Sequence, residues 1–325
     1  MEYHSAIQSA IQEAQGALTS QQIDVSVERI AYHGWPDCLH INNGRVEAIV
    51  VPAIGRVMQL RLSGDGAGGF WENRALDGQL HSHIQNQWMN FGGDKCWPAP
   101  QTDWPRLQGH DWPPPAGFDA RPMGAAVTEC GVVLTSPVDP AYGIQVVRHV
   151  ELEVDHPILR IRTEYLKLVG SAVRVGIWTI TQMQTPERAC MMLSVPSNFD
   201  GGYISLREAE PAGLKIEGRL LSLECHPSEL VKIGSDASSL AWVGQSCAVR
   251  IDAEQGPGEY PEGGCVTQIY TNPEPEPYVE METLGPLANL SIGDRIERTT
   301  LYTVFPRSVA DPEAEARKVL NAVAS

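Results

Sequence analysis

The stretch Leu159-Arg160-Ile161-Arg162-Thr163-Glu164 decides the fold class of this chain. Apolar and polar residues alternate in it with a period of two, which is typical of a β-strand that buries one face and exposes the other. Residues 144–154 and 173–184 form strand-like runs of similar length, and Asp155-His156-Pro157 supplies a turn between neighbouring runs. The middle of the chain therefore predicts a group of adjoining long strands.

Short strand signals continue on both sides of this stretch. Before it, Asn42-Asn43-Gly44 separates two apolar runs and is a β-hairpin signal. The runs before it are residues 25–32, 38–42, 46–52 and 57–62, and those after it are residues 203–207, 240–243, 247–252, 266–270, 278–283 and 295–305. So many strands, separated by loops rich in glycine and proline, predict an all-β fold in the form of a large antiparallel sandwich.

Helices are expected only at the two ends of the chain. Ile7, Ile11 and Ala14 have helical spacing and predict a short amphipathic helix within residues 1–20. Asp311-Pro312-Glu313 combines an N-cap, a first-turn proline and an acidic first turn, and it predicts a C-terminal helix over residues 311–324. Because no linker divides the 325 residues, we expect a single domain with its sandwich in residues 25–306.

Charge and cysteine content restrict the partners. A formal net charge of -16 gives a surface that repels phosphate backbones and anionic membranes, so we expect neither nucleic acid nor membrane as a partner. The N-terminus has no signal-peptide pattern, and no apolar run is long enough to span a bilayer. Seven scattered cysteines without a CxxC pair argue against a disulfide framework and a structural zinc site. These features predict a cytoplasmic protein.

A tryptophan-rich segment supplies the first candidate site. Residues 71–112 hold five of the eight tryptophans, around Asn90-Phe91-Gly92-Gly93-Asp94-Lys95-Cys96-Trp97-Pro98-Ala99-Pro100-Gln101. Rigid aromatic planes with amide and charged groups between them suit a polyhydroxylated ligand, so we interpret the segment as a loop that walls a sugar pocket. The alternative is an aromatic plug that closes one end of a sheet. The candidate ligand-binding residues are Asn90, Asp94, Trp97, Gln101, Trp104 and Trp112.

Two carboxylates form the second candidate. In Tyr278-Val279-Glu280-Met281-Glu282-Thr283, strand alternation places Glu280 and Glu282 on one face. Neighbouring carboxylates disfavour each other's ionisation where water is excluded, so one of them could act as a general base or acid near neutral pH. The alternative is an ordinary acidic outer face. Trp178 and Gln182 also share a strand face, which suits either a sugar ring or a buried core pair.

His81 and His83 form a His-x-His pattern that could bind a metal together with His110 or Asp94. Hydrogen bonding to substrate hydroxyls, or no role at all, is the preferred interpretation of these histidines, and we expect no metal. We also expect no cofactor, because the glycine-rich residues 64–69 lack the lysine of a P-loop and the strand-to-helix context of a dinucleotide site.

Several of these segments together resemble the galactose mutarotase-like superfamily, which includes the aldose 1-epimerases. Residues 47–57, which end in Gly55-Arg56-Val57, are similar to its early strand pair. Residues 90–101 and Trp112-Pro113-Pro114-Pro115 look like an uncharacterised bacterial branch of it. Residues 278–294 resemble its late strand and the turn that follows. The resemblance covers roughly residues 25–306 and implies a β-supersandwich with a concave carbohydrate site.

The resemblance also implies an isomerase of the mutarotase type, in which a late glutamate is the general base and a histidine is the general acid. Either Glu280 or Glu282 matches the glutamate, but Thr181-Gln182 stands where the superfamily has its histidine. Glutamine cannot donate and recover a proton at neutral pH, so another acid would have to serve. Lys95 stands where the superfamily has an arginine near the sugar ring, and Arg56 is expected to contact the ligand.

The catalytic candidates are therefore Glu280, Glu282, Lys95, His81 and His83, and the substrate-binding candidates include Trp178, Gln182 and Arg56. The expected partner is a small carbohydrate, and the expected reaction is epimerisation or mutarotation at a hemiacetal. The alternatives are a non-catalytic sugar-binding protein and a sugar lyase or hydrolase, because one fold hosts several chemistries.

Overall fold

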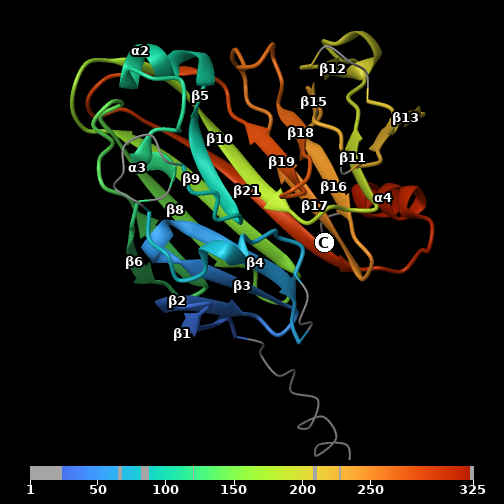
Figure 1. Cartoon of the computed structure of the whole chain (residues 1–325), viewed down its shortest axis with the longest axis horizontal. Coiled ribbons are helices and arrows are strands. Elements are labelled where there is room, and N and C mark those ends of the chain that lie inside the picture. Colours follow the sequence, from blue (N-terminus) through green and yellow to red (C-terminus); the bar gives the residue numbers. More distant parts are fainter. Residues whose placement is uncertain are drawn as a thin grey trace, which may run out of the picture.

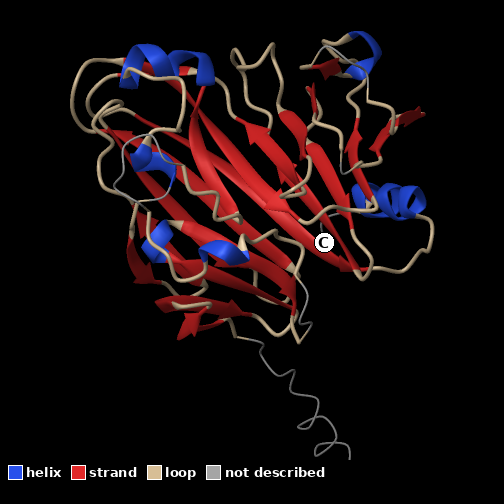
Figure 2. Cartoon of the chain, in the orientation of Figure 1, coloured by secondary structure: helices blue, strands red, loops and turns tan. Residues whose placement is uncertain are grey.

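A computed structural model describes residues 24–64, 68–81, 88–119, 121–207, 211–226 and 228–322. Two large antiparallel sheets pack against each other, and the few helices lie at the periphery (Figures 1 and 2). This arrangement confirms the predicted all-β sandwich. The predicted N-terminal helix lies outside the described residues, and the single-domain organisation stays a prediction.

The first sheet has eleven strands and carries the early hairpins and the late strand. Its order is β1 (Ser26–Tyr32), β2 (Trp35–Asn42), β3 (Val46–Val51), β4 (Arg56–Leu62), β5 (Asp94–Ala99), β10 (Val173–Met183), β19 (Tyr278–Leu284), β18 (Thr267–Asn272), β15 (Val231–Ser235) and β12 (Ile204–Ser205), with β20 (Ala288–Leu290) paired to β10.

The second sheet has ten strands and contains the stretch that predicted the fold. Its order is β13 (Leu214–Glu217), β14 (Leu220–Leu223), β11 (Arg188–Met192), β16 (Ser239–Val243), β17 (Cys247–Ala253), β21 (Arg295–Pro306), β9 (Ile158–Lys167), β8 (Ile144–Leu152), β7 (Gly131–Thr135) and β6 (Gly124–Val127). In β9, Leu159 and Ile161 are buried while Arg160 and Arg162 are half-buried, as the alternation predicted.

The core lies between the two sheets. Val279 and Met281 of β19 belong to the same buried apolar cluster as Val249 and Ile251 of β17. Since successive side chains of a strand point to opposite faces, Glu280 and the residues paired with it face away from the second sheet. The sandwich interior thus determines which side of the first sheet carries the polar residues.

The helices are short except for α4 (Pro312–Asn321), which confirms the predicted C-terminal helix. The Asp311 carboxylate caps it by accepting a hydrogen bond from the Ala314 amide at 2.7 Å. Its apolar residues Ala316, Val319 and Leu320 pack on the outer face of the second sheet. The other short helices are α2 (Trp104–Gln108), α3 (Ala116–Asp119), η1 (Pro52–Ile54), η2 (Arg74–Leu76), η3 (Gln101–Asp103) and η4 (Asp200–Gly202).

One segment differs from its prediction. We expected a loop over residues 90–101, but Asp94–Ala99 form β5, a buried strand between β4 and β10 (Figure 1). Among the described residues, a single pair, Val57 with Asp94, joins β5 to β4. Most of β5 therefore has a hydrogen-bonded partner strand on the β10 side alone. Such a position tolerates Pro98, because a proline has no N–H to offer to a ladder.

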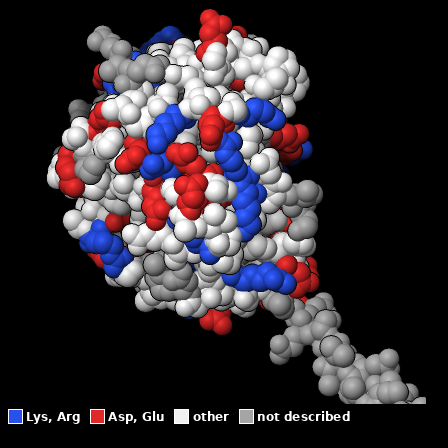
Figure 3. All heavy atoms as spheres, turned by 90° about the vertical axis from the view of Figure 1, so that its right-hand side faces the viewer, with Lys and Arg blue, Asp and Glu red and all other residues white. Residues whose placement is uncertain are grey.

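The surface mixes both signs of charge. On the face shown in Figure 3, acidic and basic side chains lie next to one another. Across the described ranges, no helix is long and apolar enough to cross a membrane. In the same ranges the cysteines form no disulfide, which agrees with their predicted lack of a disulfide framework.

Candidate functional site

Three neighbouring strands bring the predicted residues onto one face of the first sheet. Trp97 of β5 pairs with Trp178 of β10, and Lys95 pairs with Ile180. On the other side of β10, Gln182 pairs with Glu280 and Ile180 pairs with Glu282. Directly paired residues share a face, so these side chains lie together on the face turned away from the second sheet.

Two further strands, β18 and β15, extend this face. Glu282 pairs with Gln268, Glu280 pairs with Tyr270, and Tyr270 pairs with Lys232. We call Lys95, Gln182, Lys232, Glu280 and Glu282 the polar cluster. Sequence reasoning missed Lys232; the signal available was the alternation of Val231, Ile233 and Ser235 around it, which would have predicted β15.

Glu280 is held by two donors of the polar cluster. The Lys95 Nζ atom lies 3.4 Å from Glu280 Oε1, and Gln182 Nε2 donates a hydrogen bond to the same oxygen at 3.0 Å. Lys95 is completely enclosed, and its Nζ lies 5.0 Å from the centre of the Trp97 ring. Burial lowers the pKa of Lys95, while the charge of Glu280 acts in the opposite direction.

Glu282 has a different environment. The Trp178 indole N–H donates to Glu282 Oε2 at 2.7 Å, and the Lys232 Nζ atom lies 3.5 Å from that oxygen. Burial, opposed by Lys232, Trp178 and Lys95 and assisted by the charge of Glu280, gives Glu282 a raised pKa of about 7. A carboxyl group poised near neutral pH can exist in either protonation state in the cell.

Several acceptor atoms around the polar cluster lack donors. Within the described part of the chain, Gln182 Oε1, Glu282 Oε1 and Asn90 Oδ1 are buried and have no hydrogen-bond partner, and the same is true of Oε1 and Nε2 of Gln268, which pairs with Glu282. Buried polar atoms are nearly always paired, so unpaired acceptors in one neighbourhood indicate a missing donor. The hydroxyl groups of a sugar are suitable donors.

The tryptophans form the plug that we considered as the alternative interpretation. Trp97 makes edge contacts with Trp88, Trp104, Trp112 and Trp178, at ring-centre distances of 6.3, 5.6, 5.8 and 5.5 Å. Trp104 is fully buried, and its indole N–H donates to the Pro98 carbonyl. Trp104 thus lies in the core, whereas Trp112 remains 41% exposed, and their predicted roles as stacking surfaces stay predictions. Gln101 begins η3, beyond β5, and is half-buried.

Asp119 holds this plug together, and it was not predicted as a functional residue from the sequence. Its carboxylate accepts hydrogen bonds from the indole N–H groups of Trp88 and Trp97, and it pairs with Arg56 at 2.8 Å. Arg56 is fully buried and also donates to the Gly92 carbonyl. The guanidinium of Arg56 thus anchors the plug, and its predicted contact with the ligand stays a prediction.

Asp94 lies on the opposite face of β5 from Lys95 and Trp97. It is fully buried between the two sheets, where Arg148 pairs with it and Tyr302 and Thr181 donate to its Oδ2 atom at 2.7 and 2.8 Å. Strand alternation directs the Asp94 side chain into the sandwich, away from the face of Lys95, and its predicted role in ligand binding stays a prediction.

The proposed roles of His81 and His83 stay predictions. His81 is partly buried, and His83 lies outside the described residues. In the ranges that the structure covers, no group of three His, Cys, Asp or Glu side chains is arranged to hold a metal ion. The polar cluster is thus built from carboxylates, ammonium groups and an amide.

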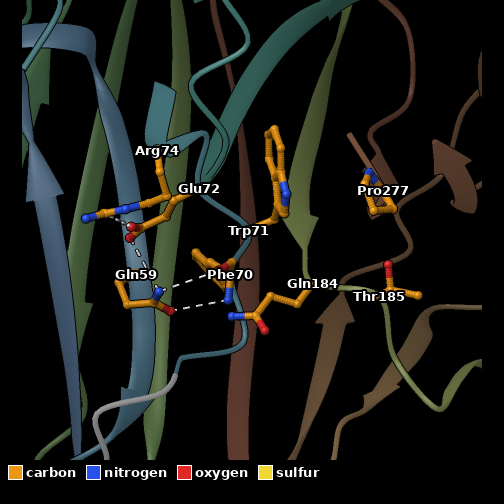
Figure 4. Close-up of a pocket in the computed structure, with 8 residues that line it drawn as sticks. All are labelled: Gln59, Phe70, Trp71, Glu72, Arg74, Gln184, Thr185 and Pro277. Carbon is orange, nitrogen blue, oxygen red and sulfur yellow. Dashed lines mark hydrogen bonds and ion pairs between the residues drawn. The ribbon is translucent and has the colours of Figure 1, made fainter. Parts of the chain in front are cut away.

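Two cavities lie beside the residues that precede β19, and none of the residues that line them belongs to the polar cluster. One of about 470 Å³ is shown in Figure 4 and is lined by Gln59, Phe70, Trp71, Glu72, Arg74, Gln184, Thr185 and Pro277. The Trp71 ring stands in it and packs against Tyr278, two residues before Glu280, at 4.7 Å. A second cavity of about 410 Å³ is lined by Asn73, Leu76, Gln79, Trp88, Met89, Asn90 and Glu276. Both volumes are in the range of small-molecule sites, about 300–1,000 Å³.

Comparisons with known proteins agree with this architecture. No protein-family model and no curated protein matches the chain. Among solved structures, a proposed aldose 1-epimerase from Klebsiella pneumoniae is 10% identical, with a TM-score of 0.57 over 91% of this chain and 85% of that one. A galactose mutarotase-like protein from Lactobacillus casei is 10% identical, with a TM-score of 0.56 over 82% of this chain and 100% of that one.

A TPR-domain containing protein from Parabacteroides distasonis is 14% identical, with a TM-score of 0.57 over 85% of this chain. The match covers 48% of that protein, so this chain spans about half its length. Likeness at these identities concerns the backbone arrangement alone. The chain therefore has the galactose mutarotase-like fold that its sequence resemblance implied.

Proposed function

We propose that this protein is a sugar isomerase of the aldose 1-epimerase type, which opens and recloses the hemiacetal ring of an aldose. The observation that carries the proposal is the contact between Lys95 and Glu280, a proton donor and a proton acceptor 3.4 Å apart on one sheet face. Cavities lined by aromatic and amide side chains lie beside Glu276 and Pro277, just before the strand that carries Glu280, and offer what a polyhydroxylated ligand requires.

The reaction needs one base and one acid close together, because the two oxygens that gain and lose protons are bonded to the same anomeric carbon. Glu280 accepts the proton of the anomeric hydroxyl, the bond between the anomeric carbon and the ring oxygen breaks, and Lys95 protonates the released oxygen. Rotation about the adjoining carbon–carbon bond exposes the other face of the carbonyl. Ring closure then returns both protons to their original holders.

Contacts favour Glu280 over Glu282 as the base. Glu280 Oε1 lies 3.4 Å from the Nζ atom of the proposed acid Lys95, whereas Glu282 Oε2 already accepts from Trp178 and lies beside Lys232. A general base must come within hydrogen-bond reach of the substrate proton. Glu282 is therefore proposed as a positioning residue that acts through Lys232 and Glu280.

Lys95 supplies the acid that the superfamily takes from its histidine. Burial lowers the pKa of Lys95, so its ammonium group is a stronger acid than that of a free lysine. Gln182, at the position of the histidine, donates to Glu280 and orients the base instead of transferring a proton.

The test is NMR exchange spectroscopy on a panel of aldoses, with wild-type protein and the variants Glu280→Gln, Glu282→Gln and Lys95→Met. Loss of a general acid or base typically costs about 10²–10⁴-fold, and we expect losses of that size for Glu280→Gln and Lys95→Met. A smaller loss is expected for Glu282→Gln. The matched control Glu28→Gln, in the exposed part of β1, is expected to leave the rate unchanged.

Three outcomes would contradict the proposal. Saturable sugar binding without faster anomer exchange would identify a sugar-binding protein instead of an enzyme. Catalysis that survives Glu280→Gln but not Glu282→Gln would transfer the role of base to Glu282. If the exchange rate of every aldose equalled its rate in buffer and no aldose bound, the proposal that the ligand is a sugar would be contradicted.

A further inference from the structure

A second site lies at one end of the sandwich, around Arg298 of β21. The alternation that buries Thr300, Tyr302 and Val304 also directs Arg298 inward, and this side chain is only 7% exposed. Its NH1 atom donates to the Glu254 carbonyl at 2.9 Å. In the part of the chain that the structure describes, its Nε and NH2 atoms have no hydrogen-bond partner.

The two unpaired atoms are the ones that matter for recognition. Nε and NH2 lie on the same edge of a guanidinium group and form the fork that binds a carboxylate or a phosphate with two parallel hydrogen bonds. No carboxylate of the described residues forms an ion pair with Arg298, although Glu259 and Glu297 nearby pair with Arg174 and Arg162. Burial lowers the pKa of Arg298, and the Tyr260 hydroxyl and the charge of Glu254 oppose this effect without forming an ion pair with the guanidinium, so a bound anion would add a favourable contact.

A cavity adjoins this guanidinium. It has a volume of about 210 Å³ and is lined by Ile177, Pro257, Gly285, Pro286, Leu287, Ala288, Ile296, Glu297 and Arg298. Apart from Arg298 and Glu297, the lining is apolar or glycine, and Glu297 is an exposed residue already paired with Arg162. The cavity is smaller than the usual range for drug-sized ligands, about 300–1,000 Å³, so it suits a small molecule.

Gly285 keeps the space next to Arg298 open. A Cβ atom at this position would lie 3.3 Å from Arg298 Cδ and 3.4 Å from the Ile177 carbonyl oxygen. The loop that follows is fixed by the hydrogen bond from the Leu287 amide to the Glu259 carbonyl at 2.8 Å. The cavity is thus lined by residues of β10, β20 and β21 and of the segment 285–287 that follows β19, and not by one exposed loop.

We propose that Arg298 and this cavity bind a small organic carboxylate whose short apolar tail lies among Pro286, Leu287 and Ile296. The carboxylate accepts from Nε and NH2 of Arg298, and the tail displaces water from the apolar lining. Inorganic phosphate offers the same charge without the tail, which makes it the discriminating probe. This site is separate from the polar cluster and does not depend on the proposed sugar chemistry.

Isothermal titration calorimetry on the full chain tests the proposal, with acetate, butanoate, butanamide and inorganic phosphate as probes. We expect saturable binding of butanoate, weaker binding of acetate by about threefold to fourfold per missing methylene, and no binding of butanamide. Arg298→Gln is expected to weaken butanoate binding roughly tenfold to hundredfold, because hydrogen bonds to charged groups are lost. Arg295→Gln, at the exposed start of the same strand, is the matched control and is expected to bind as the wild type does.

Equal affinities for butanoate and butanamide would overturn the role of the charge, and phosphate binding as tight as that of butanoate would overturn the role of the apolar tail. Undiminished butanoate binding by Arg298→Gln would place the ligand elsewhere. The comparison of butanoate with butanamide uses the wild-type protein, so it decides the matter even if the variant does not fold. Aldose exchange rates measured in parallel report on the polar cluster independently.

Discussion

Glu282→Gln should make the protein more stable at neutral and alkaline pH. The Glu282 side chain is completely buried, and burial raises its pKa from the ordinary value of 4.5 to about 7. Glutamine has nearly the same shape and can still accept the hydrogen bond from Trp178, but it carries no charge at any pH. The substitution therefore removes the cost of ionising a buried carboxyl group and keeps the packing.

The magnitude follows from the linkage between protonation and folding. The folded chain holds the Glu282 proton more tightly than the unfolded chain, so the wild type loses stability as the pH rises from about 4.5 to about 7 and does not regain it above. The difference of the two pKa values corresponds to about 3 kcal/mol, at about 1.4 kcal/mol per unit. Near pH 4.5 the wild type and the variant should be almost equally stable.

The assay is urea denaturation of both proteins at a series of pH values between about 4.5 and about 9, analysed as the difference in free energy of unfolding. Glu28→Gln, on the exposed part of β1, is the control and should follow the wild type throughout. If the free energies of wild type and Glu282→Gln remained parallel over this range, Glu282 would not have a raised pKa and the description of its environment would be wrong.

Three other predictions concern the interior of the sandwich, the polar cluster and the cavity next to Trp71. Arg148→Met leaves Asp94 buried without its cation and should cost about 3–5 kcal/mol in urea denaturation; an unchanged midpoint would contradict this role. Lys95→Met should also lower the free energy of unfolding, whereas the double variant Lys95→Met with Glu280→Leu should regain that stability and stay inactive. A further loss of stability in the double variant would argue against the ion pair between Lys95 and Glu280. If the ligand stacks on Trp71, Trp71→Ala should raise KM about threefold to tenfold with little change in kcat, measured by NMR exchange.

Sequence patterns predicted the structure correctly where the local signal was regular. Residues 159–164, the Asn-Gly hairpin and the Asp-Pro-Glu helix start correspond to β9, the β2–β3 turn and α4. The face shared by Glu280 and Glu282 also follows from period two, because β19 is a regular strand paired on both sides. In these segments, local pattern and tertiary packing favour the same structure.

The tryptophan-rich segment shows why the rest could not be predicted. Glycine and proline around Asp94–Ala99 are turn signals. This segment is nevertheless a strand, because β10 pairs with it along its whole length. Once β5 is taken as a loop, nothing in the sequence separates Asp94 from Lys95. The two side chains then appear to share a pocket, whereas the strand directs them to opposite faces.

The polar cluster is better explained by chemistry than by stability. Burying two carboxylates and two ammonium groups is costly, and apolar residues of similar volume would often hold the sheet as well. In the proposed reaction, the sugar gives a proton to Glu280 and takes one from Lys95, which converts the ion pair into two neutral groups while the open-chain sugar stays neutral. Surroundings that exclude water disfavour the ion pair more than the neutral pair. The same burial that lowers the pKa of Lys95 would therefore favour ring opening, and no net charge would have to form in the enclosed site at any stage.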